Sequence, residues 1–67
     1  MEDKGRICEL LLKALQETRN HEDMTELSYD EASETVTIRW LSGGKRVVNV
    51  AADSGTAMIR DIMRMID

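Results

Sequence analysis

The chain has 67 residues and carries 13 acidic against 9 basic side chains, a formal net charge of −4. A chain of this length forms one domain. At this size the burial of apolar surface barely offsets the loss of chain entropy, so we expect that a partner could complete the core. The acidic balance argues against a general polyanion binder, and apolar runs such as residues 10–12 are far too short to cross a membrane.

The charge is uneven along the chain. Residues 1–34 carry ten acids and four bases, whereas residues 35–67 carry three acids and five bases, which leaves room for a local basic patch. The single cysteine, Cys8, cannot form an internal disulfide, and the acidic start lacks the basic and apolar regions of a signal peptide. We therefore expect a cytoplasmic protein without cofactor, metal site or membrane contact.

The first segment with a regular apolar pattern spans residues 4–19. Its apolar side chains recur at spacings of three and four, which is typical of an amphipathic helix with one buried face. Asp3 precedes the pattern and is suited to cap the helix by accepting hydrogen bonds from its first free N–H groups. The face expected to be buried comprises Ile7, Cys8, Leu11, Leu12, Ala14 and Leu15.

A short first strand is predicted over residues 25–29, where Leu27 and Tyr29 alternate with polar side chains. A four-residue loop at residues 31–34 then joins it to the second strand. The predicted pairs across this loop are Leu27 with Ile38 and Tyr29 with Val36. With these pairs the two apolar side chains of the first strand share one face with those of the second.

A second hairpin is predicted around Gly43 and Gly44, with strands over residues 35–41 and 45–51. A three-residue loop at residues 42–44 keeps the apolar side chains on one face, whereas a two-residue loop scatters them over both. Gly44 then takes the left-handed position of the loop. The predicted pairs are Trp40 with Arg46, Ile38 with Val48 and Val36 with Val50.

The two faces of the predicted sheet differ in polarity. The apolar face, which we expect the helices to cover, carries Leu27, Tyr29, Val36, Ile38, Trp40, Val48 and Val50. The opposite face is mostly polar, and its two apolar exceptions are Leu41 and Val47.

The last helix is predicted over residues 55–66, with Asp53 or Ser54 as its cap. Ile59, Ile62, Met63 and Ile66 form its apolar stripe, which Met58 and Met65 broaden. Two amphipathic helices need an apolar surface, and one face of the sheet offers it. We therefore predict an α+β domain spanning residues 1–67, in the order α-β-β-β-α, with a three-stranded antiparallel meander and both helices packed on one face.

The chain order is also that of double-stranded RNA-binding domains. Those domains resemble one another in a lysine-rich start to the last helix, whereas residues 53–58 here read DSGTAM, so only the chain order is shared. Residues 47–62, VVNVAADSGTAMIRDI, resemble the C-terminal half of short uncharacterised bacterial proteins, some from mobile elements, that share a VNVxxDSGxAMIRDI-like stretch. This resemblance covers less than half of the chain. It implies a strand, a capping turn and a helix in a bacterial or phage cytoplasm, and no particular activity.

No residue pattern indicates catalysis. His21 would have to serve any base role alone, Cys8 fits a small buried hydrophobe, and residues 21–23 fit a solvated loop better than a metal site. The turn at residues 53–56 could hold a phosphate at a helix N-terminus, but the charge of Asp53 opposes this and capping explains the pattern. We therefore expect neither an enzyme nor a bound cofactor.

The methionines of the last helix carry the leading functional hypothesis. Apolar side chains wrap more of this helix than one sheet and one neighbouring helix cover, which predicts a strip for a protein partner or for self-association. Filling of gaps in a small core is the alternative explanation. The predicted interaction surface comprises Met58, Ile62, Met65 and Ile66.

The alternative function is a small nucleic-acid-binding accessory protein. The bases available to it are Arg39, Lys45, Arg46, Arg60 and Arg64. In the predicted register Arg39 and Arg46 lie on opposite faces of the hairpin, so these bases do not converge. Both large aromatic side chains lie on the core face, which leaves none for base stacking. The leading hypothesis is therefore a non-catalytic protein-interaction module, with a homodimer as one form of the interaction.

Overall fold

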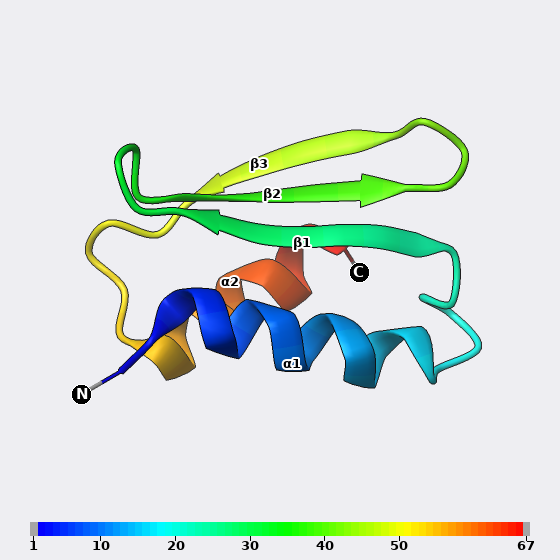
Figure 1. The fold of residues 1–67 in the computed structure, drawn as a ribbon, viewed down its shortest axis with the longest axis horizontal. Coiled ribbons are helices and arrows are strands. Elements are labelled where there is room, and N and C mark those ends of the chain that lie inside the picture. Colours follow the sequence, from blue (N-terminus) through cyan, green and yellow to red (C-terminus); the bar gives the residue numbers. More distant parts are fainter. Residues whose placement is uncertain (1, 67) are drawn as a thin grey trace.

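The computed structural model describes residues 2–66, which form two helices and a three-stranded antiparallel sheet (Figure 1). The strand order in the sheet is β1-β2-β3, so each strand pairs with its neighbour in sequence. This confirms the predicted α-β-β-β-α meander. The predicted domain of residues 1–67 also includes Met1 and Asp67, which lie outside the described residues. The elements are α1 (Lys4–Gln16), β1 (Met24–Asp30), β2 (Thr35–Trp40), β3 (Lys45–Asn49) and α2 (Gly55–Ile66).

Helix α1 begins where the sequence predicts and ends three residues earlier. The Asp3 carboxylate accepts a hydrogen bond from the Arg6 N–H at 3.0 Å, which confirms its capping role. After Gln16, the N–H groups of Glu17 and Thr18 donate to the carbonyls three residues before them. These shorter hydrogen-bonded turns tighten the chain and end the α-helix before residue 19.

One side of α1 faces the sheet. Cys8 and Leu15 are buried there, and Ile7, Leu11 and Leu12 pack partly against the core. The prediction is wrong at Ala14, which is exposed. At 3.6 residues per turn, Ala14 lies about 120° around the helix from Cys8 and so points away from the sheet.

The hairpin of β1 and β2 has the predicted register. Leu27 lies opposite Ile38 and Tyr29 opposite Val36, which confirms the four-residue loop. β1 begins earlier than predicted because Thr25 forms a bulge between the pairs of Met24 and Glu26. The extra residue turns Met24 onto the face of Leu27, where its side chain is buried.

The hairpin of β2 and β3 is shifted by two residues from the predicted register. The observed pairs are Val36 with Val48, Ile38 with Arg46 and Arg39 with Lys45. Gly43, at a φ of 98°, takes the left-handed position that was predicted for Gly44, and its N–H donates to the Trp40 carbonyl at 2.9 Å. Gly44 instead lies opposite Trp40, where a Cβ would come within 3.4 Å of the indole ring. A shift of two residues keeps every side chain on its predicted face, so the faces are right although the pairs are wrong.

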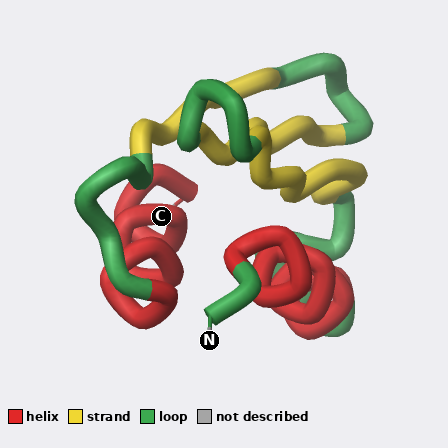
Figure 2. The backbone as a smooth tube through the Cα atoms, turned by 60° about the vertical axis from the view of Figure 1, so that its left-hand side comes forward, coloured by secondary structure: helices red, strands yellow, loops and turns green. Residues whose placement is uncertain are grey.

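The core lies between the sheet and the two helices, which lie on the same side of the sheet (Figure 2). β3 ends at Asn49, two residues before the predicted end, because Asp53 N–H donates to the Val50 carbonyl and turns the chain toward α2. The buried apolar side chains are Cys8, Leu15, Met24, Leu27, Val36, Ile38, Val48, Val50, Met58 and Ile62.

Helix α2 starts at a corner that residues from the other end of the chain help to build. Of the two predicted caps, Ser54 acts: its hydroxyl accepts from the Ala57 N–H at 3.2 Å. The Glu2 carboxylate accepts from the Gly55 N–H at 2.9 Å. A carboxylate beside the first turn also complements the helix dipole.

Candidate interaction surface

Half of the predicted apolar surface on α2 belongs to the core. Met58 and Ile62 have 0% exposed side-chain area, and the prediction is wrong for both, because α2 turns this side toward the sheet and α1. Met65 is 37% exposed, and Ile66 packs partly against the core. The apolar surface that remains lies at the C-terminal end of α2.

The five bases of the alternative hypothesis are all exposed and lie on different sides of the molecule. Arg39 forms an ion pair with Glu26 at 3.0 Å on the outer face of the sheet, where Lys45 lies opposite it. Arg46 lies opposite Ile38 and therefore on the helix-covered face, instead of opposite Trp40 as predicted. Arg60 and Arg64 project from α2. Two of these residues, Lys45 and Arg46, line a common hollow.

This hollow, of about 510 Å³, lies where the hairpin of β2 and β3 approaches the C-terminal end of α2. It brings together members of both predicted sites, Lys45 and Arg46 from the bases and Met65 and Ile66 from the apolar set. Trp40 also lines it, and the loop after α1 contributes polar side chains. The charged lining consists of two cations, Lys45 and Arg46, and one acid, Asp23. Two cations beside apolar side chains suit an apolar group of a partner whose acidic neighbour lies on the side of the cations.

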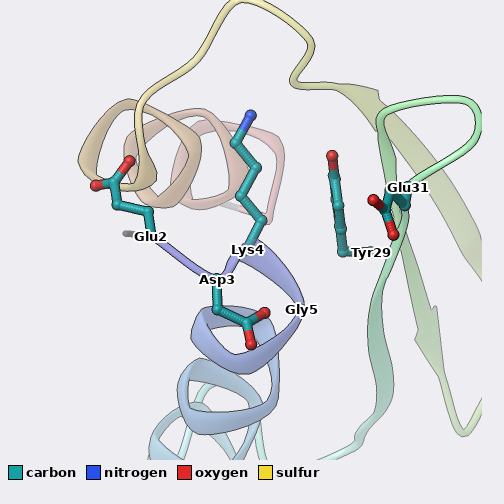
Figure 3. Close-up of a pocket in the computed structure, with 6 residues that line it drawn as sticks. All are labelled: Glu2, Asp3, Lys4, Gly5, Tyr29 and Glu31. Atoms are coloured by element: carbon teal, nitrogen blue, oxygen red, sulfur yellow. The ribbon is translucent and has the colours of Figure 1, made fainter.

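A second open hollow, of about 810 Å³, lies beside the start of α1 (Figure 3). Lys4 extends between α2 and Tyr29; its ammonium donates to the Val50 carbonyl at 2.8 Å and lies 5.8 Å from the centre of the Tyr29 ring. Burial, then the acids Glu34 and Glu31, raise the pKa of Tyr29. The Tyr29 hydroxyl therefore remains protonated at neutral pH, and the Lys4 ammonium is held by the Val50 carbonyl. Tyr29 and Lys4 therefore do not form a pair suited to acid-base catalysis.

Two carboxyl groups meet between the corner loop and α2. Hydrogen bonding to Asp61, burial and the negative charge of Asp61 raise the pKa of Asp53, while Lys4 opposes this shift. Asp53 Oδ2 is buried without a hydrogen-bond partner among the described residues. The pair of carboxyl groups therefore favours the protonated form of Asp53. The two carboxyl groups lie beside the residues that hold the start of α2 in place. We therefore assign them a structural role and not a binding role.

Cys8 and the metal-ligating side chains can be described for residues 2–66. Cys8 is buried, and burial raises the pKa of its thiol to about 11, so it is a poor nucleophile. Residues 2–66 hold no cluster of three or more metal-ligating side chains. Within the same residues, no helix has the length and apolar character needed to cross a bilayer.

The free edge of the sheet is the most regular exposed feature of the molecule. In Figure 1, β3 forms the border of the sheet away from α1. Its middle residue, Val47, is 52% exposed on the outer face, and Leu41 in the adjoining loop is 79% exposed. The alternation of side chains in the sequence places Val47 and Leu41 on the otherwise polar face of the sheet. Two apolar side chains on a polar face were the sequence feature that could have indicated a binding surface at β3. The predicted meander already makes β1 and β3 the edge strands, but side-chain patterns alone did not mark the β3 edge as a site.

No protein-family model, curated protein or solved structure was found to match this chain. The geometry of the β3 edge and of the adjoining hollow is therefore the basis for a functional proposal.

Proposed function

We propose that the chain is a non-catalytic, cytoplasmic protein-interaction module that binds an extended polypeptide segment along the edge of β3. The observation that carries the proposal is the unpaired, regular edge strand with exposed Val47 at its centre. An added strand takes its affinity from main-chain hydrogen bonds and its specificity from alternate side chains. The reduced, buried Cys8 supports the cytoplasmic location.

The adjoining hollow supplies side-chain selectivity. Met65 and Ile66 offer apolar contact, while Lys45 and Arg46 favour an acidic group. We therefore expect the preferred segment to carry an apolar side chain with an acidic neighbour near its end at this hollow.

Selection from a displayed library of ten-residue peptides tests the proposal. Enriched peptides should slow the hydrogen exchange of the backbone amides of Lys45, Val47 and Asn49, since these face away from β2. Val47→Pro removes the central donor of the edge without removing a hydrogen bond to β2, and should abolish binding. Leu41→Ser is the matched control, because it removes an exposed apolar side chain from the loop and leaves the edge intact.

Nucleic-acid binding is the competing outcome of the same experiment. It predicts retention on heparin that falls steeply with salt, because phosphate contacts release counterions, and that is lost in Lys45→Gln/Arg46→Gln. Such retention, together with peptides that leave the β3 amides unprotected, would refute strand binding at this edge.

A further inference from the structure

The two edges of the sheet differ in how open they are. The β1 edge is interrupted by the bulge at Thr25, and α1 runs along β1 and contacts it extensively (Figure 1). The β3 edge has no bulge in its pairing with β2, and α2 makes far fewer contacts with it. Proteins commonly protect sheet edges with bulges, prolines, covering elements or charged side chains, and of these β3 has only the charges of Lys45 and Arg46 at its first two positions. The open edge is therefore a template for one more strand.

The backbone groups that β3 offers follow from its hydrogen bonds to β2. Trp40 N–H donates to the Gly44 carbonyl at 3.0 Å, and Val50 N–H donates to the Glu34 carbonyl at 2.9 Å. Hydrogen-bonded and non-hydrogen-bonded pairs alternate in an antiparallel ladder, so residues 46 and 48 bond to β2 between these two anchors. The N–H and C=O groups of Lys45, Val47 and Asn49 consequently point outward.

We propose that the edge is occupied by β3 of a second copy of this chain, paired antiparallel about a two-fold axis at Val47. This inference rests on the proposed binding of a strand along the β3 edge and names its partner. It does not draw on the adjoining hollow, because β3 carries no acidic residue. The outward groups of three residues on each copy form six main-chain hydrogen bonds, and the two sheets become one sheet of six strands. A two-fold axis perpendicular to the sheet keeps the helices of both copies on the same face.

The side chains of β3 favour this arrangement. Full overlap of a five-residue strand with its copy requires the axis at its middle residue, Val47. Lys45 then lies opposite Asn49 of the second copy, and Arg46 lies opposite Val48 of the second copy. No two cations face each other, and the exposed Val47 side chains of the two copies meet at the axis.

Two-fold axes at the other residues of β3 give less favourable pairings. An axis at Lys45 or Arg46 places two like charges directly opposite each other, which destabilises a strand pair. An axis at Val48 or Asn49 leaves Lys45 and Arg46 beyond the end of the pairing, opposite the turn that follows β3. Self-complementarity therefore selects one register, and that register can be tested residue by residue.

Single-cysteine variants report the register. Val47→Cys places two thiols opposite each other at about 5.5 Å between Cα atoms, which is within the range that a disulfide spans. Lys45→Cys and Asn49→Cys are matched controls on the same face, because each lies about 14 Å along the strand from its own copy. A mixture of these two variants pairs position 45 with position 49 of the other copy. The native Cys8 is buried and does not compete.

Facing thiols in a dimer act at an effective concentration of about 1 mM, so at ~10 µM chain Val47→Cys should cross-link roughly a hundredfold faster than either control variant alone. The mixed pair should cross-link at a rate close to that of Val47→Cys. Val47→Lys should weaken the dimer in sedimentation, since it places two ammonium groups at the axis. The unmodified chain should sediment as a dimer whose Lys45, Val47 and Asn49 amides exchange slowly.

Three results would overturn the second copy as occupant. They are a monomer at every concentration up to ~1 mM, a dimer that Val47→Lys leaves unchanged, and equal cross-linking at positions 45, 47 and 49. If library peptides still protect the β3 amides of a monomeric chain, strand binding at this edge stands and only the occupant is wrong. If no peptide protects them either, both proposals fall.

Discussion

Met58 lies in the core and Met65 lies at the surface of α2. Truncating each to alanine measures how much each side chain contributes to the free energy of unfolding. Met58 is 0% exposed, and removing a buried side chain of this size costs about 2–5 kcal/mol through lost burial and the cavity left behind. Met65 is 37% exposed at the C-terminal end of α2, so we expect Met65→Ala to cost less than about 1 kcal/mol.

The size of the domain makes this contrast large. At about 0.05–0.15 kcal/mol per residue, a chain of this length has roughly 3–10 kcal/mol of total stability, so Met58→Ala removes a substantial part of it. At ~4–8 °C per kcal/mol, the melting temperature should fall by tens of degrees for Met58→Ala and by a few degrees for Met65→Ala.

Urea unfolding followed by circular dichroism gives both free energies, and it should be run at two chain concentrations so that any dimer contribution is separated. Equal losses for the two variants, or a larger loss for Met65→Ala, would show that α2 is rotated relative to the arrangement described here.

Three further outcomes are expected. Gly43→Val forces a side chain onto a φ of 98° and should lower stability by ~1–2 kcal/mol in urea unfolding. Gly44→Val meets the Trp40 ring and the Ser42 hydroxyl at ordinary contact distances and should cost less, and the reverse order would restore the register predicted from sequence. Cys8, with its pKa raised to about 11, should react with a thiol reagent at pH 8 only as fast as the chain opens, and a rate equal to that of the urea-unfolded chain would contradict its burial. The raised pKa of Asp53 means that the folded state binds the proton of this carboxyl group more tightly than the unfolded state does. Its contribution to the free energy of unfolding is therefore fully present below the pKa of the unfolded state, and it is lost as the pH rises through the higher pKa of the folded state. Asp53→Asn should reduce this acid-side gain in melting temperature, and an unchanged pH profile would exclude the carboxyl pair as its source.

The sequence was sufficient for the chain order, the sheet faces and the first hairpin. The side-chain alternation and the polar loop at residues 31–34 left one register for β1 and β2. For β2 and β3 two registers of the same parity were compatible with the pattern, because Gly43 and Gly44 both tolerate a left-handed φ. In the structure Gly43 is the glycine with the left-handed φ, and the pattern of side chains alone did not distinguish it from Gly44.

The interaction surface was harder to predict than the fold. At 3.6 residues per turn the large apolar side chains of α2 span about 160° of its circumference, with Met65 at one edge of this arc. The arc is wider than the side that turns toward the sheet, which buries Met58 and Ile62 and leaves Met65 37% exposed. That orientation depends on where α2 sits between β3 and α1, which local periodicity does not encode. The bulge at Thr25 could not be predicted from the sequence pattern either, because it depends on how β1 pairs with β2.

The corner at the start of α2 has a consequence for the order in which the chain folds. Its hydrogen bonds join Glu2 to Gly55 and Lys4 to Val50, across 53 and 46 residues, whereas both hairpins close over loops of a few residues. Closing a longer loop costs more entropy, so we expect the contacts of this corner to form after the two hairpins. In unfolding we expect the same contacts to open before the hairpins do. The Gly55 amide should then exchange its hydrogen faster than the paired amides of β2 under native conditions.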